Sequence, residues 1–291
     1  MNMTSWPAVG LAALLVSNIC LPPPNSGELI LWNKLGSVDE VQHSAVGPNG
    51  HIVGTVLFEP SQHGNGFRSA PRTGDPNVPD NFVRFHLPKL GSQGTIEFWY
   101  HPNWMDWGVG HVIDLIQYGV PENPGSVVQA LQFNDWQNRG SVWARDDSSS
   151  SKIAVEYFYP SSDPQWSTAA PIHLAYTWDA SADKKVVFYI NGEPSGSGYF
   201  DSNPDFLWPF VETRYLYVGS RMYSGDWYRH NWEPNVDGII DNIKVWDYAK
   251  TDFSDRFKDR PTSKIQCKNG TWSAFGFKNQ GQCIKFVNTG K

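Results

Sequence analysis

The chain has 291 residues, of which 40% are hydrophobic and 18% are charged, and its formal net charge is −6. This hydrophobic content excludes a chain that is disordered throughout, because enough apolar surface is available to build a core. The acidic balance and the lack of basic clusters argue against nucleic-acid binding, since phosphate contacts need Lys and Arg. The 14 tryptophans are expected either to fill a β-sandwich or to line a surface on which a ligand stacks.

Residues 1–24 are predicted to form a secretory leader. The uncharged stretch 8–16 has the length and the small apolar side chains of a signal-peptide core. Three prolines at 22–24 would end a helix, so the stretch is too short for a membrane span. The alternative is an N-terminal extension, because the stretch carries no Lys or Arg and no small-residue cleavage triplet before Cys20. A secreted protein is the expectation.

From Glu28 to about Ala249 the chain is predicted to form many short strands separated by turn clusters, such as those at 64–66 and 195–198. No amphipathic helix of ten or more residues is expected, and the best helical candidate is the short segment 251–257. This pattern predicts an all-β fold with two packed sheets. The expected strands are 28–33, 51–58, 81–87, 95–101, 111–118, 127–133, 141–145, 153–158, 173–178, 185–190, 214–219 and 238–246.

Alternation along three of these strands predicts which side chains are buried. Large apolar residues recur at every second position, and Glu97 interrupts the opposite face of its strand. Asn191-Gly192 follows the third strand directly and is a strong signal for a two-residue antiparallel hairpin. The predicted core rows are Ile96, Phe98 and Tyr100; Leu174, Tyr176 and Trp178; and Val186, Phe188 and Ile190.

Three segments together resemble the laminin-G-like branch of the concanavalin A-like lectin/glucanase superfamily. They are GTIEFWYHP at 94–102, HLAYTWD at 173–179 with VFYING at 187–192, and VDGIIDNIKVWDYA at 236–249. The resemblance covers roughly residues 28–257. It implies a two-sheet antiparallel jelly-roll sandwich.

The segment 258–291 is predicted to be a separate C-terminal tail. Its sequence around Cys267 and Cys283 resembles a short tail that ends many bacterial secreted proteins. A disulfide between these two cysteines is expected and would order the tail, at about 3 kcal/mol, rather than the sandwich. Two free thiols are the alternative.

Asp241 is the strongest candidate for a metal ligand. By the period of two it should share a face with Ile239, Ile243 and Val245, and a carboxylate in an apolar row is costly unless it is paired. The resemblance implies that the matching aspartate holds a structural Ca²⁺ together with main-chain carbonyls, which here would come from the regions of Ser44 or Gly66. Hydrogen bonds from backbone amides to Asp241 are the alternative.

Two predicted loops, 104–107 and 223–232, combine aromatic side chains with hydrogen-bonding groups, a combination that suits sugar rings. Packing of these aromatics beneath the loops is the alternative. The candidate ligand-binding residues are Trp104, Trp107, Tyr223, Asp226, Trp227, Arg229 and Trp232.

Relatives in the superfamily include glucanases and lyases, and the retaining glucanases place two carboxylates on one strand in an E-x-D-x-x-E pattern. No such pattern occurs, although Glu97 and Glu156 could meet other carboxylates across strands. The sequence therefore favours a secreted, non-catalytic module that binds glycan or another extracellular surface. The alternatives are an adhesive sandwich with a protein partner and a divergent polysaccharide hydrolase or lyase.

Overall fold

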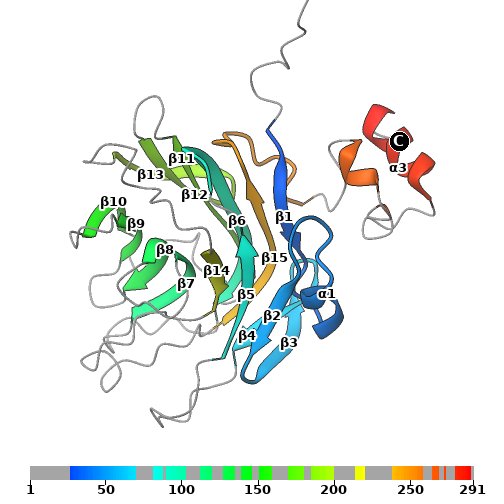
Figure 1. Cartoon of the computed structure of the whole chain (residues 1–291). Coiled ribbons are helices and arrows are strands. Elements are labelled where there is room, and N and C mark those ends of the chain that lie inside the picture. Colours follow the sequence, from blue (N-terminus) through cyan, green and yellow to red (C-terminus); the bar gives the residue numbers. More distant parts are fainter. Residues whose placement is uncertain are drawn as a thin grey trace, which may run out of the picture.

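The computed structural model confirms an all-β sandwich of two antiparallel sheets (Figure 1). It describes residues 27–69, 81–87, 90–102, 112–119, 127–134, 139–145, 151–158, 170–179, 185–199, 214–219, 238–257, 264–268, 272 and 279–289. The predicted leader, with Cys20, lies outside these residues. None of the helices in the described part of the chain is long and apolar enough to cross a membrane.

The larger sheet has eight strands in the order β13-β12-β11-β6-β15-β4-β3, with β1 also paired to β15. These strands are β13 (Glu193–Tyr199), β12 (Lys185–Ile190), β11 (Ile172–Asp179), β6 (Gln93–Pro102), β15 (Gly238–Trp246), β4 (Gly64–Ser69), β3 (Val56–Ser61) and β1 (Leu29–Asn33). The smaller sheet has seven strands in the order β10-β9-β8-β7-β14-β5-β2. They are β10 (Ser151–Phe158), β9 (Arg139–Arg145), β8 (Val127–Asn134), β7 (Val112–Gly119), β14 (Arg214–Val218), β5 (Phe82–Leu87) and β2 (Gly50–Val53).

The three predicted apolar rows are confirmed as core of the larger sheet. All nine side chains belong to one buried cluster, together with the inward-facing residues of the smaller sheet. Burying each large apolar side chain contributes about 1.5–3 kcal/mol, so these rows fix which face of each strand points inward. The inward residues of β5 and β14 are Val83, Phe85, Leu87, Leu216 and Val218.

The hairpin at Asn191-Gly192 is also confirmed, and both residues have positive φ angles, of 53° and 86°. The strand that follows was not expected, because the small residues of 195–198 were predicted to form a turn. That prediction is wrong: Gly196 and Ser197 pair with Phe188 and Val187 inside β13. Glycine and serine are accepted there because β13 is an edge strand of the sheet.

The single strand expected at 51–58 is in fact two strands that belong to different sheets. β2 and β3 are separated at Gly54, whose φ of 72° turns the chain. The predicted turn at 64–66 is likewise the start of β4. A Cβ on Gly66 would lie 2.8 Å from the carbonyl oxygen of Ile240, so glycine is needed here for close approach to β15.

The helices differ from prediction. Residues 254–257 form only a turn, in which the Arg256 amide donates to the Phe253 carbonyl oxygen. Two helices are described in other places, α1 (Val38–Gln42) and α3 (Gln280–Thr289). The ten-residue α3 was missed although Asn279 is a recognisable N-cap: its Oδ1 accepts a hydrogen bond from the Gln282 amide.

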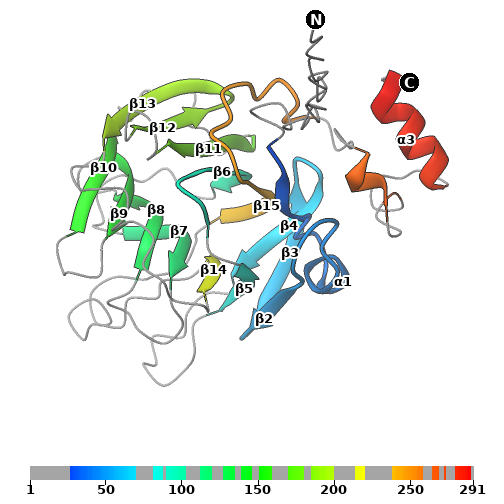
Figure 2. The same ribbon diagram turned by 45° about the horizontal axis from the view of Figure 1, so that its top comes forward.

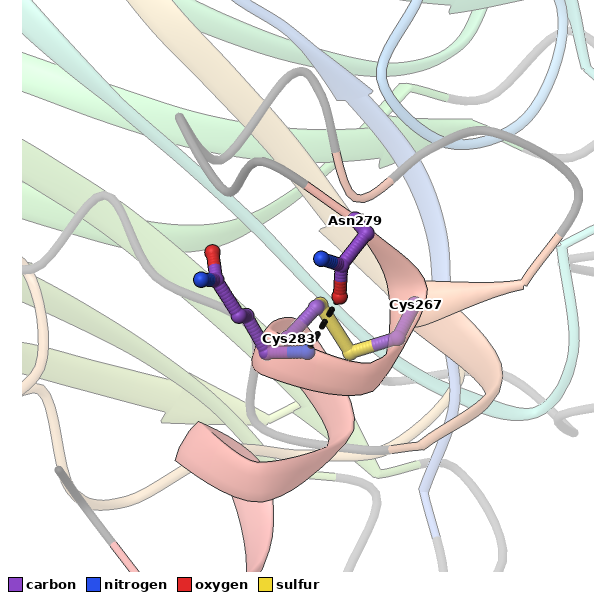
Figure 3. Close-up of a disulfide and its surroundings, with 4 residues drawn as sticks. Cys267, Asn279 and Cys283 are labelled. Atoms are coloured by element: carbon purple, nitrogen blue, oxygen red, sulfur yellow. Dashed lines mark hydrogen bonds between the residues drawn. A yellow bond between two sulfur atoms is a disulfide. The ribbon is translucent and has the colours of Figure 1, made fainter.

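In the tail, α3 is joined to the short 3₁₀ helix η4 (Ile265–Cys267) by a disulfide between Cys267 and Cys283 (Figure 3). Both cysteines are buried. The tail is drawn beside the sandwich rather than within either sheet (Figure 1). The bridge therefore orders the tail itself.

Candidate functional site

The ligand-binding residues predicted in the two loops lie outside the described part of the chain. The same holds for the side chain of Glu156, whose strand β10 is described by its backbone alone. The loop site therefore stays a prediction. The residues concerned are Trp104, Trp107, Tyr223, Asp226, Trp227, Arg229 and Trp232.

The strand β15 carries a bulge that overturns the predicted placement of Asp241. Its pairing with β6 steps from Asp241 opposite Trp99 to Lys244 opposite Glu97, so β15 has one extra residue. The extra residue makes Ile240, Ile243 and Val245 the core positions. Asp241 instead lies on the outer face of the larger sheet, the face turned away from the core. The predicted row of Ile239, Asp241, Ile243 and Val245 is wrong.

The bulge has a cause in the sheet topology. Along one edge, β15 pairs first with β4 at Ile240 and then with β1 from Ile243 onward. Asn242 stands at this change of partner with a φ of 57°, and its amide donates to the Lys34 carbonyl oxygen at 3.2 Å. Its side-chain oxygen accepts a hydrogen bond from the Trp32 indole. An asparagine tolerates the left-handed conformation that this switch requires.

Asp241 is fully buried and links β15 to the turn between β3 and β4. Its Oδ2 accepts a hydrogen bond from the His63 amide at 2.8 Å, which is the amide-bonded alternative considered for this residue. Gly66 lies against it, since a Cβ on Gly66 would come within 2.9 Å of the Asp241 Cβ.

The described contacts of Asp241, Gly66 and Ser44 match only part of what a calcium site requires. The Ser44 hydroxyl donates to the Pro48 carbonyl oxygen at 2.6 Å and accepts from the Asn33 amide group at 2.8 Å. Calcium takes six to eight oxygen ligands, and no group of three or more His, Cys, Asp or Glu residues suited to a metal occurs within the described ranges. A calcium ion held by Asp241, Gly66 and Ser44 stays a prediction.

Glu97 is the centre of a buried polar cluster on the outer face of the larger sheet. Its Oε1 accepts hydrogen bonds from the Trp246 indole at 2.6 Å and from the Lys250 ammonium at 3.0 Å. Its Oε2 accepts from His173 Nε2 at 3.0 Å. The Lys250 ammonium also donates to Asp255 Oδ1 at 2.7 Å. We call Glu97, His173, Trp246, Lys250 and Asp255 the Glu97 cluster.

The surroundings shift the pKa values of Glu97 and His173 in the Glu97 cluster. Burial raises the pKa of Glu97, but the hydrogen bond from His173 and the nearby Lys250 and Lys244 outweigh it and hold that pKa well below the ordinary value. Burial lowers the pKa of His173 despite the opposing effect of Glu97. The result is an ionised Glu97 beside a neutral His173 that donates through Nε2.

The Glu97 cluster fastens the segment that follows β15 onto the outer face of the larger sheet. Phe253 packs on Ala175 and Tyr189, and the Lys250 amide donates to the hydroxyl of Thr95 at 2.8 Å. Figure 2 shows this segment, in orange, leaving β15 and looping back along the same sheet. Glu97 is 2% exposed and holds three donors, so it is an internal anchor and not an accessible catalytic carboxylate.

A cleft of about 580 Å³ opens beside this cluster. Its lining is mainly polar and includes Gln93, Asp179, Asp252 and Asp255, and Tyr248 is the one aromatic ring among its lining residues. The cleft offers hydrogen-bonding groups to a ligand but little surface for stacking.

A second surface, on the outer face of the smaller sheet, combines stacking with hydrogen bonding. Arg84 and His86 alternate with core residues along β5, and both flank the ring of Tyr215 on β14. The Arg84 guanidinium lies 5.1 Å from the Tyr215 ring centroid, and the His86 ring centroid lies 5.2 Å away. His51 on the edge strand β2 pairs with Arg84. Phe82, Arg84, His86, Tyr215 and His51 are called the Tyr215 patch below.

The Tyr215 patch is accessible at its rim. His51 and His86 are exposed, and Arg84 and Tyr215 are half-buried. Farther in, Tyr217 is 5% exposed and contacts Phe82 at a centroid distance of 5.5 Å. This surface was not predicted from the sequence. Its signal is the alternation in 81–87 and 214–219, where the positions opposite the core carry aromatic rings, Arg and His.

The chain matches a family model, Laminin_G_3, over residues 77–253; the family is described as the concanavalin A-like lectin/glucanases superfamily. No curated protein matches the chain in sequence. Among solved structures, the receptor-binding domain of botulinum neurotoxin type G is 12% identical, with a TM-score of 0.52, over 79% of this chain and 51% of that chain. The binding domain of botulinum neurotoxin DC in complex with SialylT is 14% identical, with a TM-score of 0.51, over 78% of this chain and 49% of that chain.

Domain 4 of an extracellular arabinanase from Geobacillus stearothermophilus, in complex with arabinotriose, is 17% identical over 77% of this chain and 94% of that chain, with a TM-score of 0.49. The chain spans about half the length of the two neurotoxin chains. At these identities the likeness is one of fold. The family match and the sandwich agree with the motifs at 94–102, 173–192 and 236–249. The protein belongs to the laminin-G-like family of the concanavalin A-like lectin/glucanase superfamily.

Proposed function

We propose that the protein is a non-catalytic recognition module that binds glycan. The family is one of lectins and glucanases, and the two neurotoxin structures of similar fold are named as binding domains. Because fold alone does not establish function, the proposal depends on a surface that suits a sugar.

The Tyr215 patch is the observation that carries the proposal. A sugar ring presents C–H groups that pack on an aromatic face and hydroxyls that need hydrogen-bonding partners. Tyr215 supplies the ring, and Arg84, over that ring at 5.1 Å from its centroid, and His86, at 5.2 Å, supply polar groups beside the ring surface that remains. A small number of polar groups around an aromatic surface is typical of sites that bind small organic ligands.

Of the two carboxylates singled out in the sequence, Glu97 does not fit a hydrolytic role. A retaining or inverting glycosidase needs two carboxylates that reach the substrate from opposite sides. Glu97 is instead buried and engaged by Trp246, Lys250 and His173. Secretion and a calcium ion at Asp241 are parts of the same proposal, and the disulfide is compatible with an oxidising compartment.

The test is glycan-array and polysaccharide binding by the full chain with calcium present, comparing wild type with Y215A. Loss of a central aromatic contact typically costs 2 kcal/mol or more, so binding should weaken about 30-fold or more. Tyr199 is the matched control, because it is a tyrosine that is 61% exposed on β13 of the other sheet. Y199A should bind as wild type does.

Two results would count against the proposal. Absence of binding to any glycan by the wild-type chain contradicts the function itself. The second is normal binding by Y215A together with loss of binding in the Trp104→Ala and Trp227→Ala variants. That result would show that the glycan binds at the predicted loops and not at the Tyr215 patch.

A further inference from the structure

We infer that the Tyr215 patch binds an acidic glycan, a chain that carries uronic-acid carboxylates, and that Arg84 pairs with such a carboxylate. This inference rests on the proposed function and names its ligand class. It concerns the surface of β2, β5 and β14, to which the sequence analysis assigned no role.

The charge on this surface is positive although the whole chain has a net charge of −6. No Asp or Glu occurs in the described strands β2, β5 and β14, or at 115–119 of the neighbouring β7. The ionisable groups on the outer face there include Arg84, His51 and His86. An anion that approaches this face meets a guanidinium and two imidazoles without a competing carboxylate from β2, β5 or β14.

The geometry leaves Arg84 able to bind a carboxylate. Its guanidinium lies over the Tyr215 ring, with its Cζ 5.1 Å from the ring centroid, and this contact with the ring does not use the N–H donors as hydrogen-bond donors to an oxygen acceptor. Arg68 on β4 shows the contrasting case, since its Nη1 donates to both oxygens of Glu59 at 3.0 and 3.1 Å. Within the described residues Arg84 has no such carboxylate partner, so a ligand can supply it.

The strand order sets a path for a chain-like ligand. His51 pairs with Arg84 across β2 and β5, and His86 pairs with Tyr215 across β5 and β14. Paired residues share a face, so the patch crosses three strands, a width of about 10 Å. Because β2 is the edge strand of the smaller sheet, the patch is open on that side. A glycan can therefore lie across the strands, with one sugar ring against Tyr215 and the carboxylate of that sugar at Arg84.

Charge density favours a uronate chain over a polysulfate or a nucleic acid. Arg84 is the one permanent cation on the described outer face of β2, β5 and β14. A single guanidinium matches one carboxylate per sugar, whereas heavily sulfated chains and nucleic acids need several Lys or Arg contacts. The negative charge of the remaining chain opposes such dense polyanions further.

The experiment is affinity gel electrophoresis of the full chain in gels that contain polygalacturonate, alginate or hyaluronate, with galactan and dextran as neutral polymers and heparin and DNA as dense polyanions. Wild type should be retarded by at least one uronate polymer at 50 mM NaCl. Loss of a charge-assisted hydrogen bond should weaken that binding about 10- to 100-fold in R84Q. Raising the salt to 500 mM should weaken it as well.

R68Q is the matched control, because it removes an arginine charge from the other sheet and should leave the retardation unchanged. R84K retains the charge but not the planar fork, and intermediate binding is expected. Thermal melting of each variant checks that the fold is intact.

The outcomes separate this inference from the proposed function. Binding to neutral polymers that R84Q does not alter overturns the acidic ligand and leaves glycan binding in place. Binding to heparin or DNA alone, lost in R84Q, overturns the uronate assignment. Retardation by no polymer overturns both.

Discussion

The Glu97 cluster predicts a large loss of stability when Lys250 is replaced by methionine. The substitution keeps an unbranched apolar side chain but removes the ammonium, which lies 4.9 Å from the ring centroids of Trp246 and Phe253. It removes the ammonium that donates to Glu97 at 3.0 Å and to Asp255 at 2.7 Å. Glu97 would remain buried with one donor fewer.

The size of the effect follows from burial. Removing one partner of a buried ion pair costs about 3–5 kcal/mol, because the remaining charge stays desolvated. The side chains of Lys250 and Glu97 are 6% and 3% exposed, whereas Asp255 is 29% exposed and can be solvated by water. Since Glu97 keeps its bonds from Trp246 and His173, the lower end of about 3 kcal/mol is expected. For a domain of about 150–250 residues this corresponds to a Tm lower by about 6–12 °C.

Scanning calorimetry at pH 7 measures this shift. K185M is the matched control, because Lys185 is exposed at the start of β12 and its loss should change stability by less than about 0.5 kcal/mol. The double variant E97M/K250M should recover part of the loss, since no charge is then left buried without its partner. A K250M variant that melts within about 2 °C of wild type would refute the role of the Glu97 cluster as an anchor.

Two further predictions concern protons and calcium. Because burial lowers the pKa of His173, the unfolded chain takes up a proton that the folded chain does not, and stability should fall as the pH drops below about 6.5. Because His173 and Lys250 lower the pKa of Glu97 despite its burial, a second loss should begin below about pH 4.5. Urea unfolding across pH 7 to 4 measures the free energy of unfolding. H173Q should reduce its decline between pH 6.5 and 5, whereas H43Q, at an exposed site, should not. An unchanged pH dependence in H173Q would contradict the role of His173. If Asp241 holds calcium, EDTA should lower the Tm and excess CaCl₂ should restore it by mass action. Equal melting with and without EDTA contradicts calcium binding at Asp241.

Much of the sandwich could be predicted because its signals are local. Alternation at Ile96, Phe98 and Tyr100 and the Asn191-Gly192 turn each depend on neighbours within a few residues. The family motifs added the two-sheet jelly-roll architecture. What these local patterns determine is which face of a strand is buried.

The bulge in β15 could not be predicted in this way. The extra residue at Asn242 exists because β15 changes its partner from β4 to β1, and these strands are far from it in the sequence. A strict period of two therefore placed Asp241 on one face with Ile243 and Val245, when it lies on the face opposite to theirs. The Glu97 cluster was missed for the same reason, since Glu97, His173 and Lys250 meet only after three distant segments pair.

The candidate site also depends on pairing between strands that local sequence patterns do not reveal. Ligand-binding aromatics were predicted in tryptophan-rich loops, whereas the Tyr215 patch lies on strands. None of its outward-facing residues indicates a binding site when it is considered alone. Arg84, His86 and Tyr215 become a surface only through the register of β5 with β14.

The most direct test of the central claim is a binding measurement on three proteins side by side: wild type, Y215A and Y199A. With an acidic polysaccharide that retards the wild-type chain, Y215A should lose about 30-fold or more in affinity while Y199A keeps wild-type binding. Equal binding by Y215A and wild type, with both folded, would contradict glycan recognition at the Tyr215 patch.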